Sequence, residues 1–387
     1  MKVLLKVIFS EFLRIVLFPL RILKIKNNRI LFTGLTGGAQ TNEYSCNPMY
    51  LCEYLLKEHP GKYEIVWAVS DTKRYRSLES KGIRLVKHFS PASFPWLLTA
   101  RVIVSNGSYA PWFPFRKGQY FINTWHGGGA YKKIENSRPD ADWATRRRAK
   151  FCANNISLFV SSCKMASEKL IRGTFCYSGD ILEAGMPRND HLVRGEIKAG
   201  TDRVKAYYHI GEKEKIVLYA PTYRYGMGEV RLNADRLLAG LERDGEKWTF
   251  LYRAHRYQKE HSNLKVVGDR ITDASMYPDM QDLLASADMM ITDYSSNIWD
   301  YSFLYRPCFL FTPDLDEYLE KNGFYVDISQ WPFPVARTQE ELHQRIATYD
   351  EMENRENIER HLKFMGCMET GKSSSLIAAR IAEVCSK

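Results

Sequence analysis

The stretch "FINTWHGGGAYKKI", from Phe121 to Ile134, carries signs of both a fold and a site. Its first residues read as the end of a buried strand, and a Trp-His pair, three glycines and two lysines follow. Glycine lets another group approach the backbone closely because it has no side chain. A neutral imidazole is a suitable proton acceptor near pH 7. The stretch therefore predicts a base, His126, at the end of a strand, with open backbone and cations beside it.

Short apolar runs of the same kind recur along the chain, and amphipathic segments separate most of them. The first set of predicted strands covers residues 29–34, 63–70, 82–89, 101–107, 120–124, 158–163 and 181–185. After a polar break near 195–205, the second set covers 215–224, 248–256, 263–268, 289–296 and 307–314. Strands that alternate with helices favour parallel sheets covered on both faces. We therefore expect an α/β protein with two Rossmann-like domains that face a cleft.

The composition fits a two-domain globular protein that binds an anion. The chain has 387 residues, and 55 lysines and arginines outnumber 45 aspartates and glutamates, for a formal net charge of +10. Such an excess suits nucleic acid, phospholipid headgroups or a phosphate-rich substrate. The eight cysteines form no C-x-x-C pair. This predicts reduced thiols in a cytosolic protein and no structural zinc site.

The segment "MKVLLKVIFSEFLRIVLFPLRILKIK" at the start of the chain is apolar and basic, with its polar residues on one side of a helical wheel. Its longest unbroken apolar run covers 15–20, far short of the about 20 residues that a spanning helix needs. The pattern is typical of a helix, kinked at Pro19, that lies in a membrane interface. The alternative is a helix that packs on the protein's own core while its lysines reach water.

Polar and cationic turns follow several predicted strands, at the ends where parallel α/β sheets bind ligands. These turns read "TWHGGG", "GMPRND", "APTYR", "RAHR" and "DYSSN". They are rich in hydrogen-bond donors and cations, which is the chemistry that binds phosphate. A lone histidine is often a core residue, and a lone serine often caps a helix. Five such turns at the same ends of strands favour a phosphate-binding site instead.

The stretch "GCMETGKS", residues 366–373, matches the phosphate-binding P-loop pattern by its letters. A working P-loop follows a buried strand and opens the first helix of a domain. Here a charged helical segment precedes it, and only a terminal helix follows. We therefore interpret it as a glycine turn and a serine N-cap before that helix.

Several longer motifs occur in a fixed order along the chain: "YSCNPMYLCEYLL" (44–56), "NTWHGGGAYKKI" (123–134), "AGMPRND" (184–190), "YAPTYR" (219–224), "RAH" (253–255), "LLASADMMITDYSSNIWDYSFLYRPCFLF" (283–311) and "YLEKNGFYVDI" (318–328). Together they resemble the CDP-glycerol glycerophosphotransferase family, the teichoic acid polyol-phosphate transferases of primase and polymerase type. The resemblance covers nearly the whole chain from about residue 28.

The resemblance implies a GT-B-like fold and a membrane-bound reaction. Residues 1–27 would form the membrane-interface helix, 28–200 the acceptor domain, 201–365 the CDP-donor domain and 366–387 a C-terminal helix. The enzyme would transfer glycerol phosphate, or ribitol phosphate, from CDP-glycerol or CDP-ribitol to a hydroxyl of an undecaprenyl-diphosphate-linked saccharide, releasing CMP. It would act as a peripheral protein at the cytoplasmic face of the bacterial membrane, in teichoic acid or related cell-surface polymer synthesis. No cofactor, metal or nucleic acid is expected.

The resemblance also assigns roles to residues at the strand ends. His126 and His255 would be catalytic. The substrate-binding residues would be Gly127, Lys132, Arg188, Thr222, Arg224, Arg253, Asp293, Ser295 and Ser296. We expect Asp293 to order its turn rather than to bind a metal, since no second carboxylate is spaced beside it.

Some positions depart from the family pattern, and two other functions compete. Gly128 to Lys132 stand where the family has a Thr-Pro-Leu-Lys type sequence, Arg256 stands where proline is expected, and "PFP" (332–334) replaces Pro-Gly-Pro. One alternative is a GT-B glycosyltransferase that uses a nucleotide sugar and a lipid-linked acceptor. The other is a non-enzymatic binder of nucleic acid or lipid, which would spread its cations over one face. The basic run 146–150 is the one cluster of this kind outside the N-terminal segment.

Overall fold

The computed structural model describes residues 12, 15–36, 41–107, 113, 115–134, 137, 143–222, 230–242, 245–254 and 264–387. Contacts divide the chain into two compact units. Unit 1 consists of Met1–His126, Glu135–Asp190 and Met368–Lys387, and unit 2 of Gly127–Ile134 and His191–Cys367. The domain boundaries after residues 27, 200 and 365 stay a prediction. Two predicted site residues, Arg224 and His255, lie outside the described residues, as do residues 1–11.

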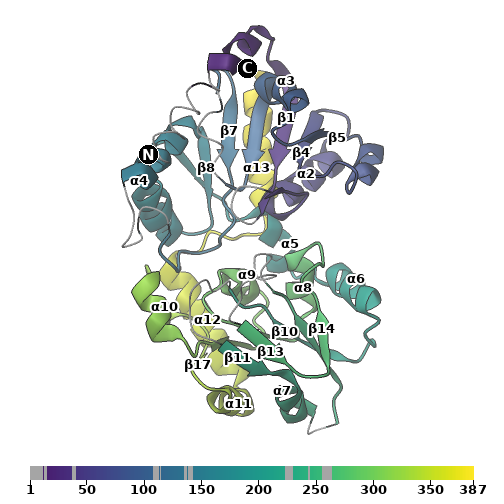
Figure 1. The fold of residues 1–387 in the computed structure, drawn as a ribbon, viewed down its shortest axis with the longest axis vertical. Coiled ribbons are helices and arrows are strands. Elements are labelled where there is room, and N and C mark those ends of the chain that lie inside the picture. Colours follow the sequence, from purple (N-terminus) through teal and green to yellow (C-terminus); the bar gives the residue numbers. More distant parts are fainter. Residues whose placement is uncertain are drawn as a thin grey trace. The chain divides into compact units, whose positions relative to one another are not determined.

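Unit 1 is built on a parallel sheet with the strand order β5-β4-β1-β6-β7-β8-β9 (Figure 1). The strands are β1 (Lys26–Thr33), β4 (Glu64–Val69), β5 (Arg84–Lys87), β6 (Ala100–Ser105), β7 (Tyr120–Asn123), β8 (Leu158–Ser161) and β9 (Asp180–Glu183). A short antiparallel pair, β2 (Leu35–Thr36) and β3 (Thr41–Asn42), follows β1. From β1 the chain builds β4 and β5 on one side and β6 to β9 on the other. The order reverses beside β1, and such a reversal is where α/β sheets bind ligands.

The helices of unit 1 cover this sheet. They are η1 (Phe18–Ile22), α2 (Cys46–Glu58), η2 (Arg76–Lys81), η3 (Pro91–Ser93), α3 (Phe94–Thr99), α4 (Trp143–Asn155), the π-helix η5 (Ala166–Thr174), η6 (Pro187–Asn189), the start of α5 (Asp190–Val193) and α13 (Ser373–Ser386). Apolar residues of α2 and α13 pack with β1, β4 and β6 in one core, which includes Trp67 and Ile377, both fully buried. The last helix of the chain is therefore part of the core of unit 1.

Unit 2 is built on a second parallel sheet, with the order β14-β12-β10-β15-β16-β17. Its strands are β10 (Lys215–Tyr219), β12 (Trp248–Tyr252), β14 (Ile271–Asp273), β15 (Met289–Thr292), β16 (Cys308–Phe311) and β17 (Val335–Ala336). A separate parallel pair consists of β11 (Val230–Asn233) and β13 (Leu264–Val267). The central strands are buried on both faces, as expected for apolar strands in a parallel sheet.

The helices of unit 2 differ at their starts, and several begin at a polar side chain that accepts a first-turn backbone N–H. They are α6 (Lys198–Tyr208), α7 (Ala234–Leu241), α8 (Met280–Ser286), α9 (Asn297–Ser302), α10 (Leu315–Lys321), η9 (Ile328–Gln330), α11 (Gln339–Ala347) and α12 (Glu351–Met365). The side chains of Asn233, Asp279, Thr338 and Asp350 each accept a hydrogen bond from a first-turn N–H of the helix that follows. Such caps stabilise a helix start by about 1 kcal/mol.

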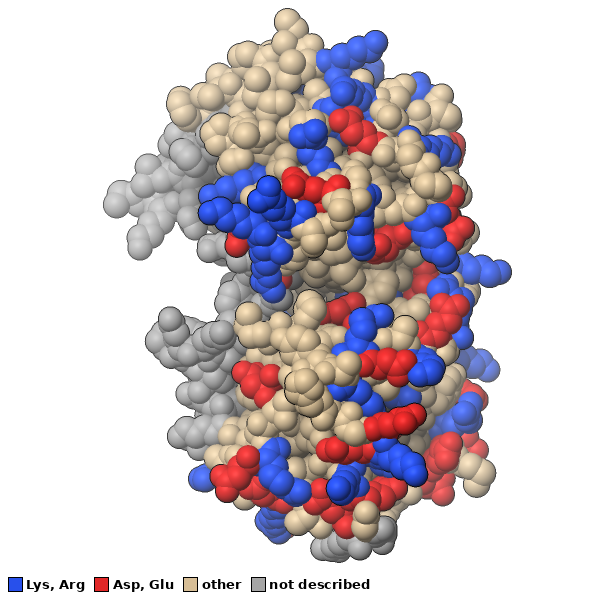
Figure 2. All heavy atoms as spheres, turned by 90° about the vertical axis from the view of Figure 1, so that its right-hand side faces the viewer, with Lys and Arg blue, Asp and Glu red and all other residues tan. Residues whose placement is uncertain are grey.

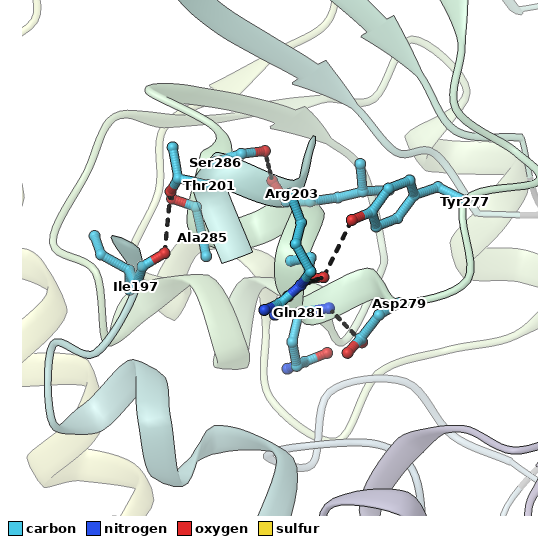
Figure 3. Close-up of polar contacts among 10 residues, drawn as sticks. Ile197, Thr201, Arg203, Tyr277, Asp279, Gln281, Ala285 and Ser286 are labelled. Carbon is cyan, nitrogen blue, oxygen red and sulfur yellow. Dashed lines mark hydrogen bonds and ion pairs between the residues drawn. The ribbon is translucent and has the colours of Figure 1, made fainter. Parts of the chain in front are cut away.

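Helices α6 and α8 are joined by polar contacts as well as by packing (Figure 3). Arg203 donates to the buried carboxylate of Asp282 from Nε at 2.9 Å and Nη2 at 2.6 Å, and the hydroxyl of Tyr277 donates to it at 3.1 Å. The hydroxyl of Thr201 donates to the carbonyl of Ala285. These bonds fix α8 directly before β15, the strand that ends at the predicted Asp-Tyr-Ser-Ser turn.

Each strand predicted from the sequence is present, which confirms the α/β class with parallel sheets. The strand predicted at residues 263–268 is β13, which pairs with β11 in a small sheet of its own and not in the main sheet of unit 2. Five strands were not predicted, namely β2, β3, β11, β14 and β17, and each is only two to four residues long.

In the N-terminal segment the described residues 12 and 15–22 are helical and present apolar side chains to solvent, but the helix ends at Ile22 and does not reach residue 27 as predicted. The 3-10 helix η1 contains Pro19 in its first turn, and β1 already begins at Lys26. Five large side chains are 53–90% exposed, namely Phe12, Ile15, Val16, Phe18 and Ile22. Over the residues that the structure describes, no helix is both long and apolar enough to cross a bilayer.

Charged side chains of both signs are interspersed on the face shown in Figure 2. The basic run on α4 is exposed at Arg146, Arg147 and Lys150. The net positive charge of the chain is therefore not gathered into a single basic surface on the face in view.

Candidate functional site

The turn after β7 has a strained backbone that three side chains hold in place. Trp125 has a φ of 53°, in the left-handed region that non-glycine residues rarely adopt. The side chain of Asn123 accepts the Trp125 N–H at 2.8 Å, and the amide of Asn47 donates to the Trp125 carbonyl at 2.8 Å. The hydroxyl of Thr124 donates to the same carbonyl at 3.2 Å. Such strain costs of order 1–3 kcal/mol and persists only where its surroundings enforce it.

This turn presents His126, the predicted base, at the carboxyl edge of the sheet in unit 1. The side chain is exposed, and its Nδ1 lies 3.0 Å from the carbonyl oxygen of Asn106 at the end of β6. A carbonyl can only accept a hydrogen bond, so Nδ1 carries the proton in this pair. In the neutral ring the lone pair is then on Nε2. In this tautomer Nδ1 orients the ring by its hydrogen bond, and Nε2 is able to accept a proton.

Arg188, predicted as a substrate contact, lies buried behind His126. Only 6% of the residue is exposed. Its Nη1 donates to the His126 carbonyl at 2.5 Å and to Sγ of Cys46 at 3.2 Å, and its backbone N–H donates to the Asn47 side chain at 3.3 Å. The guanidinium therefore holds the backbone of the base. A direct contact between Arg188 and substrate stays a prediction.

The glycine-rich segment that follows His126 packs in unit 2, and not in unit 1 with the base. An added Cβ on Gly128 would lie 2.1 Å from Cδ1 of the buried Trp299, so only glycine fits there without movement. The hydroxyl of Tyr131 bonds to Nε2 of His361 at 2.9 Å. Nδ1 of His361 lies 2.9 Å from the Gln330 carbonyl. The glycines predicted to open the backbone to a ligand thus also allow close packing on α9.

Lys132 lies within range of the charge of Asp293, which directly follows β15. Burial lowers the pKa of Lys132, while the negative charge of Asp293 opposes that shift. Both carboxylate oxygens of the fully buried Asp293 accept the Thr222 N–H at 2.9 Å, which ties the end of β10 to the end of β15. This contact orders the backbone at Thr222, while a contact between Asp293 and substrate stays a prediction. Lys132 supplies positive charge beside this carboxylate.

Arg253, Ser295 and Ser296, the other described residues predicted for the site in unit 2, lie at the carboxyl edge of its sheet. Nη1 of Arg253 donates to the carbonyls of Ala274 and Tyr277, at 3.0 and 2.9 Å, so its guanidinium is held in one place. Ser295 and Ser296 are half-buried directly before α9, and Oγ of Ser295 accepts the Asn297 N–H at 3.2 Å. With Thr222 and Lys132 they gather hydrogen-bond donors and positive charge at one edge, which suits a phosphate.

Three asparagines that hold the base were not identified from the sequence. Asn47 lies in the motif quoted for residues 44–56, and Asn106 lies in the strand predicted at 101–107. Their roles depend on a carbonyl and on contacts across the sheet, which residue types do not reveal. Asn123 directly before the turn was the only local signal, because asparagine side chains commonly accept an N–H two residues on.

Among the described residues, no three histidine, cysteine, aspartate or glutamate side chains gather as a metal site. Gly127 begins the segment that packs in unit 2. Its predicted contact with substrate, the assignments of Arg224 and His255, and the expected lack of a metal or cofactor stay predictions.

Comparison with curated proteins identifies several relatives. The chain is 27% identical to the teichoic acid poly(glycerol phosphate) polymerase of Bacillus spizizenii, with 91% of each chain covered. It is 28% identical to the teichoic acid glycerol-phosphate transferase of Staphylococcus aureus, over 92% of this chain and 94% of the relative. It is also 28% identical to the Bacillus subtilis teichoic acid poly(glycerol phosphate) polymerase, but covers only 44% of that protein. The chain thus spans about half the length of some relatives and nearly all of others.

Solved structures and a family model agree with these relatives. A histidine-to-alanine variant of the wall teichoic acid polymerase TagF has a TM-score of 0.78 at 26% identity, over 94% of this chain and 90% of that one. A histidine variant of TagF soaked with CDPG has a TM-score of 0.77 at 25% identity, with the same coverage. The model of the family described as CDP-Glycerol:Poly(glycerophosphate) glycerophosphotransferase matches residues 15–383. One sheet of this chain carries the imidazole of His126 at its carboxyl edge, and the other carries cations and hydrogen-bond donors. The chain itself belongs to this glycerophosphotransferase family.

Proposed function

We propose that this chain transfers glycerol phosphate from CDP-glycerol to a hydroxyl of a membrane lipid-linked acceptor and releases CMP, in the synthesis of teichoic acid or a related cell-surface polymer. The observation that carries the proposal is the geometry of His126. Its Nδ1–H donates to the Asn106 carbonyl, so Nε2 holds the lone pair that can accept a proton. The family membership supports CDP-glycerol as the donor.

In the proposed reaction, the acceptor hydroxyl oxygen attacks the phosphorus of the glycerol phosphate group. Nε2 of His126 takes the hydroxyl proton. A bond forms between the acceptor oxygen and this phosphorus, and the bond from the phosphorus to the oxygen shared with the CMP phosphate breaks. The products are a glycerol phosphodiester on the acceptor and CMP. General-base catalysis of this kind contributes about 10²- to 10⁴-fold.

The carboxyl edge of the sheet in unit 2 is the proposed site for the donor's diphosphate. Lys132 and Arg253 would supply positive charge, while Ser295, Ser296 and Thr222 would donate hydrogen bonds. Stabilisation of charge by fixed donors is commonly the largest contribution to a transfer of this kind. Arg224 and His255 belong to the same proposed site by the family resemblance, as does Gly127 on the acceptor side.

The apolar side chains exposed near η1 support a peripheral position at the cytoplasmic face of the membrane. Exposed large apolar groups beside basic residues suit a helix that lies in a membrane interface. An acceptor linked to undecaprenyl diphosphate would be reached from this position. The anionic headgroups would attract the lysines and arginines of the same segment.

A donor comparison tests the proposed reaction. The full chain is incubated with a lipid-linked disaccharide acceptor in anionic vesicles, with CDP-glycerol, CDP-ribitol or a UDP-sugar as donor. Released CMP or UDP is quantified, and mass spectrometry identifies the product lipid. We expect CMP and an added glycerol phosphate with CDP-glycerol. Product only from CDP-ribitol would keep the reaction but change the polyol. UDP and an added sugar would refute the transfer of a polyol phosphate and favour a glycosyltransferase.

A further inference from the structure

We propose that Glu369, in the segment between α12 and α13, is a positioning residue for His126. It would act through the loop 184–190, which carries Arg188. The inference rests on the proposed function, in which His126 is the base. All of the residues involved belong to unit 1. Glu369 lies in residues 366–373, the stretch that matches the P-loop pattern by its letters. The proposal therefore gives this stretch a role.

The carboxylate of Glu369 lies directly on the backbone of the loop. Its Oε2 accepts the Met186 N–H at 2.8 Å, and its Oε1 accepts from Nδ2 of Asn189 at 3.2 Å. An added Cβ on Gly185, whose φ is 82°, would lie 2.4 Å from Oε2. Glycine is therefore required at this position, and the carboxylate bridges the two ends of the turn that contains Arg188.

Further contacts fix the position of the segment itself. The Met368 N–H donates to the Ser162 carbonyl at 2.9 Å, and the hydroxyl of Ser373 donates to the Gly185 carbonyl at 2.9 Å. The two carboxylate oxygens of Asp190 accept the N–H groups of Ser373 and Ser374, each at 2.8 Å. An acidic group at a helix start is stabilising, because the first N–H groups of a helix lack partners within it. Loop and segment therefore hold each other.

From the loop, Arg188 continues the chain of contacts to the base. Its Nη1 holds the His126 carbonyl, and its backbone N–H bonds to Asn47, which in turn holds the Trp125 carbonyl. Arg188 and Asn47 are both buried, so neither contact exchanges freely with water. Without the carboxylate of Glu369, the Met186 N–H and the Asn189 side chain lose the acceptor that fixes the loop around Arg188. The contacts that keep Trp125 in its strained backbone conformation would then be weakened.

The chain changes units at four points, and three of them lie next to these contacts. These three crossings lie after His126, after Asp190 and after Cys367. The first follows the base, the second ends the loop, and the third precedes Glu369 by two residues. The residues that hold the base thus lie within a few residues of three points at which the chain changes units.

The test compares Glu369→Ala and Glu369→Gln with a matched control, Glu64→Ala. Glu64 also accepts two N–H bonds in unit 1, from Nε and Nη2 of Arg29 at 2.9 and 3.0 Å, but it begins β4 at the amino edge of the sheet. Each variant is assayed for kcat and KM for CDP-glycerol well below its unfolding temperature. Hydrogen exchange of peptides covering 120–127 and 184–190 is measured in parallel.

We expect Glu369→Ala to lower kcat by about tenfold or more, because small displacements of a catalytic group have effects of this size. KM for CDP-glycerol should stay unchanged, and exchange should speed up in both peptides. Glu369→Gln should recover most of kcat, since its amide oxygen can still accept the Met186 N–H. Glu64→Ala should lower the unfolding temperature without changing kcat or exchange in these peptides.

Two results would overturn the proposal. One is a Glu369→Ala protein that loses stability like Glu64→Ala but keeps its kcat and its exchange at 120–127. The other, if Glu369→Ala does not fold, is a Glu369→Gln protein that is folded and as slow as a variant without His126. If the wild-type chain does not turn over CDP-glycerol, the proposed function fails. The exchange measurement then still shows whether Glu369 controls the backbone of the turn at His126.

Discussion

At the scale of single residues, the buried His361 makes the stability of the protein depend on pH. Burial lowers its pKa to about 4, although the bond to the Gln330 carbonyl opposes the shift. In the unfolded chain the pKa is about 6.5. The neutral ring therefore stabilises the folded state fully above about pH 6.5, and that contribution is lost as the pH falls toward 4 because the unfolded state binds the proton first.

We expect urea unfolding at pH 5 to show about 2 kcal/mol less stability from this group than at pH 7.5. His361→Gln should remove this part of the pH dependence. His209→Asn is the control: His209 is exposed at a φ of 56°, which asparagine tolerates, and the pH dependence should survive that substitution. A His361→Gln protein with unchanged pH dependence would contradict the assignment.

Gly128 is a second residue whose substitution has a defined outcome. Gly128→Ala places a carbon 2.1 Å from Cδ1 of Trp299, so the glycine segment or α9 must move. We expect a loss of about 1–3 kcal/mol in the free energy of unfolding, the usual range for overpacking. The control is Gly240→Ala in α7, where an added Cβ meets no atom within 4 Å. It should be neutral or stabilise by up to about 1 kcal/mol. Equal effects in denaturant melts would refute the close packing.

The sequence predicted the base but not what holds it. His126 could be identified because a Trp-His pair at a strand end, followed by glycines, combines chemistry with access. The family resemblance assigns Arg188 to substrate binding, and this stays a prediction. Its place behind the base depends on contacts with residues 46, 47 and 126, which only the folded chain brings together.

At the scale of elements, the terminal helix shows where local patterns are sufficient and where they are not. A helix after the glycine turn was predicted, and α13 is present. The predicted serine N-cap was wrong: no side chain of the segment caps α13, and Asp190, far away in sequence, accepts the first N–H groups instead. A cap supplied by a distant loop leaves no local signal, so the sequence could not reveal that α13 belongs with unit 1.

The ion pair between α6 and α8 should respond asymmetrically to substitution. Asp282 is 4% exposed, whereas the side chain of Arg203 is 60% exposed. Arg203→Met leaves a buried carboxylate without its cation, and we expect a loss of about 3 kcal/mol. Adding Asp282→Asn should restore part of that loss, because the buried charge is then removed. Lys198→Met, in an exposed pair with Asp202, should change denaturant melts very little. A double variant less stable than Arg203→Met would refute this.

At the scale of the whole molecule, the exposed apolar side chains near η1 predict attachment to membranes. Phe18→Ser with Ile22→Ser should weaken binding to anionic vesicles by at least about tenfold, since each large apolar group contributes about 1.5–3 kcal/mol when it leaves water. Met352→Ser is the control, because Met352 is 74% exposed on α12 in unit 2. Vesicle sedimentation measures both. Unchanged binding by the double variant would move the anchor elsewhere, for example to the basic residues of α4.

The two-unit arrangement was only partly predictable for a physical reason. Strand patterns indicate two parallel sheets, because buried strands need apolar residues. They do not indicate that residues 127–134 leave unit 1 to pack in unit 2, or that 368–387 return to unit 1. Those exchanges depend on particular long-range fits, such as Gly128 against Trp299 and Ile377 in the core beside Trp67.

The central claim is that His126 removes the acceptor proton during transfer from CDP-glycerol, and His126→Asn tests it most directly. The asparagine amide can still donate to the Asn106 carbonyl, so the backbone and that bond are kept while Nε2 is lost. Single-turnover release of CMP should fall by at least about 100-fold. The affinity for CDP-glycerol, measured by calorimetry, should stay near that of the wild type. A His126→Asn protein that transfers glycerol phosphate at a near-normal rate would contradict the account.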